Sequence, residues 1–286
     1  MKYTVTGATG NLGQLVVDQL LADVTPSDVR ATIHNPKKAS LFEQKGIETR
    51  TIDYADVTSM VDAFQGTDVL VYIPSNIYNV LQAVSEFEKT LQAVQTTGIK
   101  NMVYVGFYAD QERNPFVMSS YFGYVPRRLA STDLHFAVLK NAMYADPLVP
   151  YLPELIERGA IIYPVGQAPL SYISRNDSAE AIATVATTPA LRNNGQLYTL
   201  TQPESYDMDT LATIMSDITG AKIGYAPMTL SAFIEAYRAE GDGVELGSMY
   251  HAGNLGLLST VTDDFKQITG HDAQPMPSFL KAHYQK

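Results

Sequence analysis

The segment TVTGATGNLGQLVV, residues 4–17, constrains the fold more than any other part of the sequence. Its three glycines, Gly7, Gly10 and Gly13, stand between an apolar run and a segment whose apolar residues recur at helical spacing. Glycine permits a positive φ and a close approach of the backbone. A helix N-terminus offers unpaired N–H groups and a partial positive charge. The segment therefore predicts a strand, a tight turn and a helix that together bind a phosphate group.

Strands and helices continue to alternate through the first half of the chain. The expected strands are KYTVTG, VRATIH, ETRTID, DVLVYIPS, NMVYVGFY and HFAVLK. The expected helices are NLGQLVVDQLLAD, with Leu12, Leu15, Val16 and Leu20 on one face, KKASLFEQKG, DVTSMVDAFQG and a long helix over about residues 79–97. This order predicts an α/β fold with a Rossmann-type, doubly wound parallel sheet. Such sheets bind ligands beyond the carboxyl ends of their strands.

The pattern changes after Lys140. NAMYADPLVPYLPELIERG predicts a loop and helix that leave the sheet, and SRNDSAEAIATVATTP predicts a helix capped near Asn176 or Asp177. QLYTL predicts a returning strand, and DMDTLATIMSDITG a helix capped by Asp207 or Asp209. We expect a dinucleotide-binding domain over 1–145, rejoined by 172–202, and a smaller, mostly helical substrate-side lobe over 146–171 and 203–286.

Composition excludes several classes of function. The 286-residue chain has a formal net charge of −10, which disfavours direct nucleic-acid binding. It contains no cysteine, and its five histidines are scattered without the spacing of metal ligands, so no metal site is expected. No G-x-S-x-G or H-E-x-x-H motif is present. Without a leader or a membrane-spanning apolar run, the sequence predicts a cytoplasmic protein.

The glycine spacing is G-x-x-G-x-x-G, and the G-K-[ST] ending of a nucleotide-triphosphate loop is absent. The expected ligand is therefore a dinucleotide pyrophosphate, and a tight turn without a ligand is the alternative. The candidate contacts in this loop are Gly7, Thr9, Gly10, Asn11, Leu12 and Gly13.

TGATGNLG resembles the NmrA-like group of atypical short-chain dehydrogenases/reductases, and within it the type 2 NAD(P)H:quinone oxidoreductases. The resemblance extends over HNPKKASLFEQKGIETRTIDYAD, GIKNMVYVGFY, VLKNAMYAD, YISRNDSAEAIA and LYTLTQPESYDMDTLA, and so covers most of the chain. It implies a Rossmann fold and a nicotinamide cofactor.

The end of the second strand bears on the choice of cofactor. An acidic residue there would bind the ribose of NAD, but the chain has ATIHNPKK. His34, Asn35, Lys37 and Lys38 suit the 2′-phosphate of NADPH instead. NADH stays open, because the two lysines could simply form a solvated helix start.

Further candidate contacts follow later strands. The resemblance places Asp53 and Tyr54 beside the adenine, although Asp53 could equally cap the next helix. Ile73, Pro74 and Ser75 end the fourth strand, where Ser75 is the better polar contact because proline donates no N–H. Gly106, Phe107 and Tyr108 end the fifth strand and complete the candidate cofactor residues.

Many short-chain dehydrogenases use a tyrosine with a lysine four residues later on one helix face. Here Tyr124 and Arg128 have this spacing, but we expect Pro126 to be the first residue of a helix, so that Tyr124 precedes it. Gly106 stands where related proteins often carry serine or threonine. Tyr124 is thus a candidate catalytic residue, with aromatic packing as the alternative.

Hydride transfer to a quinone needs close stacking and a shielded apolar pocket. Phe107, Tyr108, Tyr121, Phe122 and Tyr124 supply aromatic rings around the expected mouth, unless they serve only to pack the lobe. The resemblance places Asn141 and Tyr144 near the nicotinamide and substrate, and Lys140 ends the preceding apolar strand.

Tyr124, Lys140 and Asn141 are therefore the candidate catalytic residues. They favour an oxidoreductase that transfers a hydride from NADPH to a quinone or similar conjugated, aromatic acceptor. An NmrA-like sensor that binds NAD(P) without turnover is the alternative. Sugar-epimerising or isoflavone-type chemistry fits less well, because no positioned base is evident. A homodimer is expected only from the general frequency of symmetric pairs.

Overall fold

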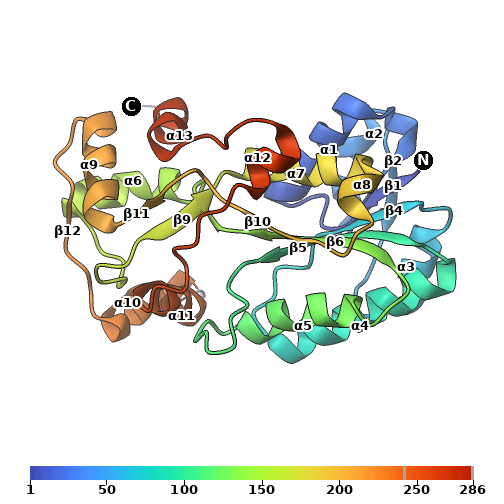
Figure 1. The fold of residues 1–286 in the computed structure, drawn as a ribbon, viewed down its shortest axis with the longest axis horizontal. Coiled ribbons are helices and arrows are strands. Elements are labelled where there is room, and N and C mark those ends of the chain that lie inside the picture. The colour runs from blue at the N-terminus through green and yellow to red at the C-terminus, as the bar shows by residue number, and fades with distance from the viewer. Residues whose placement is uncertain (241–242, 285–286) are drawn as a thin grey trace. The chain divides into compact units, whose positions relative to one another are not determined.

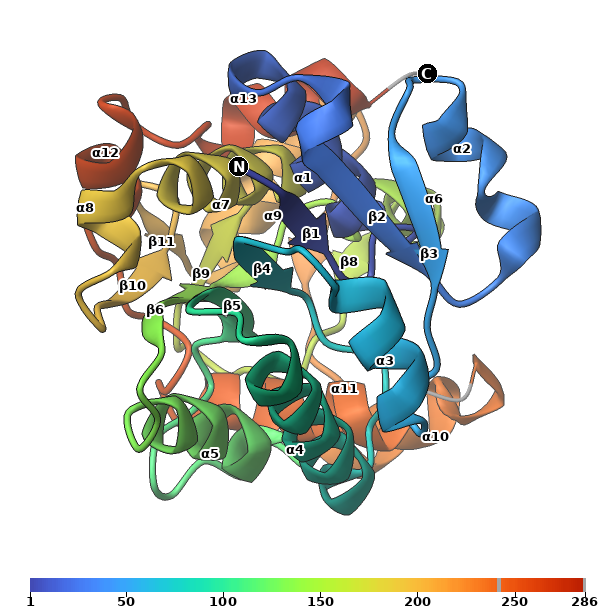
Figure 2. The ribbon, with the colours of Figure 1, turned by 90° about the vertical axis from the view of Figure 1, so that its right-hand side faces the viewer.

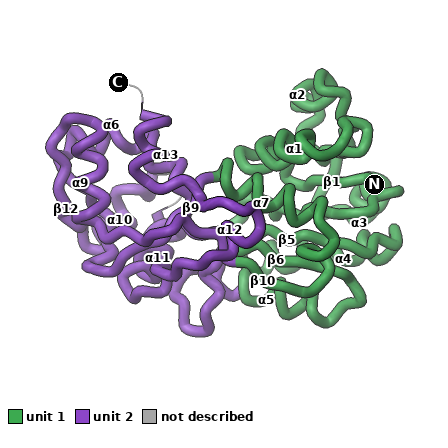
Figure 3. Tube along the Cα trace, turned by 45° about the horizontal axis from the view of Figure 1, so that its top comes forward, with its two compact units in different colours: residues 1–106, 121–140, 175–198 green, residues 107–120, 141–174, 199–286 purple. Residues whose placement is uncertain are grey.

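A computed structural model describes residues 1–240 and 243–284. The chain forms two compact units, marked in Figure 3. The first comprises residues 1–106, 121–140 and 175–198, and the second comprises residues 107–120, 141–174 and 199–286. The boundaries expected from the sequence put 107–120 and 141–145 with the dinucleotide-binding domain, whereas these segments cluster with the second unit.

A seven-stranded sheet forms the core of the first unit, with the order β10-β6-β5-β4-β1-β2-β3. Its strands are β1 (Tyr3–Val5), β2 (Val29–Ile33), β3 (Glu48–Thr51), β4 (Val69–Tyr72), β5 (Asn101–Phe107), β6 (His135–Asn141) and β10 (Leu197–Leu200). β1 pairs in parallel with β2 on one side and β4 on the other. The strand order reverses between β1 and β4, which confirms the predicted doubly wound, Rossmann-type α/β fold.

Helices cover both faces of this sheet. They are α1 (Asn11–Asp23), α2 (Ser40–Glu43), α3 (Val57–Phe64), α4 (Val80–Thr97), α5 (Ser119–Leu129), α7 (Arg175–Thr187) and α8 (Pro189–Arg192), with 3₁₀ helices at Pro26–Asp28 and Pro36–Lys38. Figures 1 and 2 show α3, α4 and α5 on one face and α1 and α7 on the other. β4 is buried along its whole length, as expected of a parallel strand covered on both sides.

Two local expectations are wrong in instructive ways. The single helix expected from KKASLFEQKG is a 3₁₀ turn over Pro36–Lys38 followed by the one-turn helix α2, in which only Phe42 is buried. One buried residue cannot stabilise a longer amphipathic helix. The helix expected to be capped near Asn176 or Asp177 starts earlier, at Arg175, so both residues lie in its first turn.

Pro126 is not the first residue of a helix. It lies inside α5, so Tyr124 and Arg128 are on the same helix, contrary to expectation. Proline removes one helical hydrogen bond, but Tyr121, Val125 and Leu129 are buried at i, i+4 and i+8. Burial of this stripe outweighs the local preference of proline for a helix start.

The second unit contains two small sheets, ordered β11-β9-β7 and β12-β8. Its strands are β7 (Met143–Tyr144), β8 (Ala160–Ile161), β9 (Leu170–Ile173), β11 (Ser205–Tyr206) and β12 (Gly224–Tyr225). Its helices are α6 (Leu148–Arg158), α9 (Met208–Thr219), α10 (Leu230–Ala236), α11 (Gly243–Asn254), α12 (Asp264–Thr269) and α13 (Met276–His283), with a 3₁₀ turn at Arg238–Glu240. Asp207 caps α9, its Oδ1 accepting the Thr210 N–H at 2.7 Å, which confirms one of the two predicted caps.

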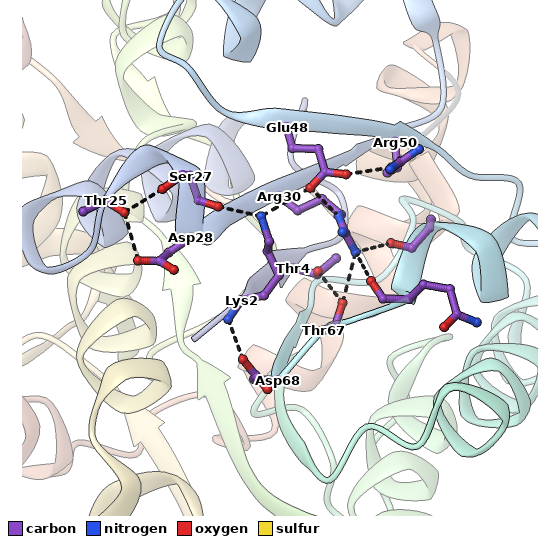
Figure 4. Close-up of polar contacts among 12 residues, drawn as sticks. Lys2, Thr4, Thr25, Ser27, Asp28, Arg30, Glu48, Arg50, Thr67 and Asp68 are labelled. Carbon is purple, nitrogen blue, oxygen red and sulfur yellow. Dashed lines mark hydrogen bonds and ion pairs between the residues drawn. The ribbon is translucent and has the colours of Figure 1, made fainter.

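A polar cluster joins the amino ends of β1, β2 and β3 in the first unit (Figure 4). Arg30 is 7% exposed, and its Nε lies 3.1 Å from Glu48 Oε2, while its Nη1 donates to the Gln65 carbonyl at 2.7 Å. Lys2 and Arg50 also pair with Glu48, at 3.3 and 2.8 Å. Burial acts to raise the pKa of Glu48, but hydrogen bonds and charges from these three cations outweigh it and lower the pKa. The cluster holds together the sheet edge opposite the glycine loop.

Over residues 1–240 and 243–284, no helix is long and apolar enough to cross a membrane. Nor do three or more histidine, aspartate or glutamate side chains gather there as potential metal ligands.

Candidate functional site

The three glycines of the first loop have distinct structural roles. Gly7 has φ +60°, and a Cβ there would lie 3.1 Å from the Ile73 carbonyl oxygen. Gly10 donates its N–H to the Gly7 carbonyl at 2.9 Å and precedes the first residue of α1. At Gly13, a Cβ would lie 2.2 Å from the Gly7 oxygen and 2.7 Å from Ala8 Cα. The turn and the close helix approach therefore require glycine at Gly7 and Gly13.

The N-terminus of α1 is suited to an anion. Its N-cap residue, Gly10, makes no side-chain cap, and the first turn carries no acidic residue. The first N–H groups of a helix have no partner within that helix, and they carry its partial positive charge. Asn11 is exposed and Thr9 half-buried beside them, whereas Leu12 is buried and packs the helix. A pyrophosphate would meet backbone N–H groups here at no steric cost.

The end of β4 fixes the glycine loop in place. The Thr6 hydroxyl donates to the Ile73 carbonyl and accepts the Ile73 N–H, both at 2.9 Å. The Tyr54 hydroxyl donates to the same carbonyl at 3.4 Å, and its ring meets Tyr72 edge-on with centroids 6.4 Å apart. Burial raises the pKa of Tyr54 to about 12, so the phenol stays neutral. Tyr54 thus helps to fix the loop through the Ile73 carbonyl, a role that the sequence did not indicate.

The carboxyl end of β2 carries exposed cations. His34, Asn35, Lys37 and Lys38 are all exposed. The Asn35 side chain accepts the Lys37 backbone N–H at 3.0 Å and caps the 3₁₀ turn that carries the two lysines. Within the described residues, neither lysine forms an ion pair with a carboxylate, so both ammonium groups can meet a phosphate.

Asp53 does not cap the helix that follows it, so that alternative is wrong. Its Oδ1 accepts the Ala55 N–H at 2.8 Å, and Asp56 caps α3 by accepting the Thr58 N–H at 2.9 Å. Asp56 is the N-cap because it immediately precedes Val57, the first residue of α3. Asp53 is left as an exposed carboxylate after β3.

Ile73, Pro74 and Ser75 follow β4 and are half-buried. The Ser75 hydroxyl donates to Glu86 of α4 at 2.5 Å.

On the next strand, Gly106 lies against the ring of Tyr104. A Cβ at residue 106 would stand 2.8 Å from Tyr104 Cε1 and 3.1 Å from the Tyr104 hydroxyl. Tyr104 thus occupies the space that a serine side chain at this position would need.

Tyr124 and Arg128 meet the same carboxylate. The Tyr124 hydroxyl donates to Glu88 Oε1 at 2.5 Å, and Arg128 donates to both Glu88 oxygens, at 2.9 and 3.2 Å. The hydrogen bond to Glu88 raises the pKa of Tyr124, the opposite of the shift that a catalytic base needs. The spacing was recognised in the sequence, but the bridging carboxylate was not.

Phe107, Tyr108 and Asn141 belong to the second unit. Phe107 packs edge-on against Tyr108 and Phe116, with ring centroids 5.5 and 5.6 Å apart. The Asn141 carbonyl accepts the Tyr108 N–H at 3.1 Å, and its side-chain amide donates to the Tyr144 hydroxyl at 2.9 Å. The ends of β5 and β6 thus carry an aromatic cluster with an adjoining amide. Lys140, the residue before Asn141, is half-buried.

A family model described as NAD(P)H-binding matches residues 7–189, from the glycine loop to the start of α8. The chain belongs to this NAD(P)H-binding family. Quinone oxidoreductase 2 of Escherichia coli is 26% identical over 267 residues, which cover 93% of this chain and 91% of that protein. An oxidoreductase from Aspergillus flavus with an NmrA-like domain is 22% identical over 96% of this chain and 92% of its own length. The resemblance drawn from the sequence is therefore confirmed at the level of the family.

Solved structures agree with the family assignment. The structure of a nucleoside-diphosphate-sugar epimerase from Staphylococcus aureus is 39% identical, with a TM-score of 0.93, and the match covers 98% of this chain and 100% of that one. Triphenylmethane reductase from Citrobacter sp., solved with NADP(H), is 28% identical with a TM-score of 0.91 over 99% and 100% of the two chains. The similarity of fold to these two structures spans essentially the whole chain.

Proposed function

We propose that this member of the NAD(P)H-binding family transfers a hydride from NADPH to a quinone or a similar flat, conjugated acceptor. The observation that carries the proposal is the glycine loop, in which a Cβ at Gly13 would lie 2.2 Å from backbone. So close an approach presents the first N–H groups of α1 to a pyrophosphate. The E. coli and Citrobacter relatives are named for quinone and triphenylmethane substrates, which are both conjugated electron acceptors.

NADPH is favoured over NADH by charge. Lys37 and Lys38 are exposed after β2 and carry no ion pair within the described residues. A 2′-phosphate beside them would gain charge-assisted hydrogen bonds. Asp53 follows β3 and not β2, so it is not the carboxylate expected to bind an unphosphorylated ribose.

We assign the acceptor to the half-buried ring of Phe107, which the buried rings of Tyr108 and Phe116 hold in place. Aromatic rings stack on a conjugated acceptor, and Asn141, whose amide donates to the Tyr144 hydroxyl, stays a candidate residue at the end of β6. Tyr124 is a weaker candidate, because its hydroxyl is bound to Glu88 and its pKa is raised.

The same observation at Tyr124 bears on the other functions. An epimerase, as the S. aureus structure is named, needs a positioned base, and a phenol held by a carboxylate is poorly suited to that role. It also supports the second candidate function, dinucleotide binding without turnover, because Gly106 supplies no side-chain hydroxyl either.

The test combines binding and turnover. NADPH fluorescence is titrated with wild type, with Lys37→Ala/Lys38→Ala, and with Lys100→Ala, a control in which an exposed lysine before β5 is removed. Loss of two charge-assisted contacts should weaken NADPH binding at least about tenfold while NADH binding is unchanged. NADPH oxidation is then followed with a panel of benzoquinones, naphthoquinones and a triphenylmethane dye.

Steady turnover with one acceptor class supports the reductase. Tight NADPH binding without oxidation across the panel supports the sensor. Equal effects of the lysine variants on NADPH and NADH would contradict the assignment of the 2′-phosphate.

A further inference from the structure

Sheet order gives the direction in which a dinucleotide lies on the first unit. The order is β2, β1, β4, β5, and β1 leads into the glycine loop that suits the pyrophosphate. Lys37 and Lys38 on the β2 side suit the adenosine phosphate. The nicotinamide half must then extend to the other side, over the ends of β4 and β5. This placement rests on the proposed function, and it puts Ser75 beneath the nicotinamide half.

A carboxylate is held at this position. Glu86 projects from the second turn of α4, where Oε2 accepts the Ser75 hydroxyl at 2.5 Å and Oε1 accepts the Gln82 side-chain amide at 3.0 Å. Both donors are neutral. No lysine or arginine pairs with Glu86 among the residues that the structure describes. Lys89, the nearest cation along this helix, donates instead to the Ala55 carbonyl at 3.0 Å.

Glu86 is half-buried and no cation neutralises its charge, so its electrostatic interaction with the anionic phosphates of the cofactor is unfavourable. The nearby phenol of Tyr54 is neutral, because burial of its hydroxyl raises its pKa to about 12, so it does not offset the charge. The glutamate has a favourable partner only when positive charge appears next to it. Loss of hydride from a dihydronicotinamide leaves a positively charged ring, and the β4 end is where this ring would lie.

We propose that Glu86 is an electrostatic positioning residue that favours the oxidised, cationic nicotinamide over the reduced, neutral one. Ser75 and Gln82 hold its two oxygens by hydrogen bonds at the β4 end. The hydride carries its electron pair to the acceptor, and solvent supplies the second proton of the reduced quinone. The glutamate thereby makes hydride release more favourable without itself exchanging a proton.

The experiment compares the dissociation constants of NADP⁺ and NADPH by calorimetry or fluorescence at low salt. Glu86→Gln keeps the shape and removes the charge. Asp62→Asn, at an exposed position on α3, is the matched control for net charge. The ratio Kd(NADP⁺)/Kd(NADPH) should rise about tenfold in Glu86→Gln, as expected for loss of one nearby charge interaction. It should stay at the wild-type value in Asp62→Asn.

Glu86→Asp, which keeps the charge, should retain most of the wild-type ratio, whereas a merely structural role would change both constants together. A ratio in Glu86→Gln within twofold of wild type, with both nucleotides bound, would overturn the inference about Glu86 and leave the proposed function standing. If wild type bound neither nucleotide, both proposals would be overturned.

Discussion

Replacing Gly13 by alanine tests the geometry of the glycine loop most directly. The new Cβ would stand 2.2 Å from the Gly7 oxygen and 2.7 Å from Ala8 Cα, and both are backbone atoms with no rotamer to relieve the contact. At an open helix position the same change would stabilise by about 1 kcal/mol. Here overpacking of about 1–3 kcal/mol opposes that gain. Since the whole of α1 must move away from the loop, we expect an overpacking cost near 3 kcal/mol. The net loss of folding free energy is then about 2 kcal/mol.

For a chain of 286 residues, about 2 kcal/mol lowers the thermal midpoint by about 3–4 °C. Because the shift moves the N–H groups of α1 away from the pyrophosphate, NADPH binding should also weaken at least about tenfold. Gly10→Ala is the matched control, since its Cβ would lie 3.2 Å from the same Gly7 oxygen and its φ of −78° is open to alanine. Its midpoint should fall by about 1–2 °C, as expected for a weaker N-cap residue.

Calorimetric scans of both variants, with and without NADPH, make the comparison. A Gly13→Ala protein as stable as Gly10→Ala, or one that still binds NADPH with wild-type affinity, would refute the close approach of α1 to the loop.

Three further predictions concern single side chains. Gly106→Ser should destabilise the protein by about 1–3 kcal/mol because its Cβ meets Tyr104. The same change made in a Tyr104→Ala background should cost less than in wild type when both pairs are compared by thermal scans. Asp207→Ala should cost about 1 kcal/mol at pH 7. Hydrogen bonds from the α9 N-terminus lower the pKa of Asp207. The stability difference between wild type and Asp207→Ala should therefore persist above about pH 4, the ordinary aspartate range, and vanish as the pH falls through the lowered pKa of the folded state. An equal stability difference at pH 2 would contradict the cap. Tyr124→Phe should leave quinone reduction within about threefold of wild type, since its hydroxyl is held by Glu88, whereas a loss of about a hundredfold would identify Tyr124 as the proton donor.

The glycine loop could be predicted from the sequence because its geometry is local. Gly10 and Gly13 contact Gly7 and Ala8, Gly7 needs its positive φ for the turn itself, and short-range periodicity sets the flanking strand and helix. The cations after β2 were found in the same way. The cap of α9 was also local, since only Asp207 immediately precedes its first residue.

Features that depend on neighbours in space could not be predicted. The local sequence at Pro126 predicts a helix start, but burial of Tyr121, Val125 and Leu129 stabilises α5 on both sides of the proline. Glu86 and Glu88 look alike on α4, yet one meets Ser75 after β4 and the other meets Tyr124 on α5. These differences arise from strand order and helix packing, which a sequence pattern does not contain.

The strand pairing of β1 and β4 has a consequence for how the chain folds. β1 pairs Tyr3 with Val29 and with Val69, and β4 in turn pairs Val69 with Asn101. None of these strand pairs forms a hairpin. The chain must therefore pay the entropy of closing a long loop before each pair can stabilise the fold. During synthesis, the wholly apolar β4 emerges well before β5 can cover its edge, and an uncovered apolar edge invites association with other chains. A ribosomal pause between residues 69 and 101 would therefore lower the yield of native protein more than a pause after β5 is complete.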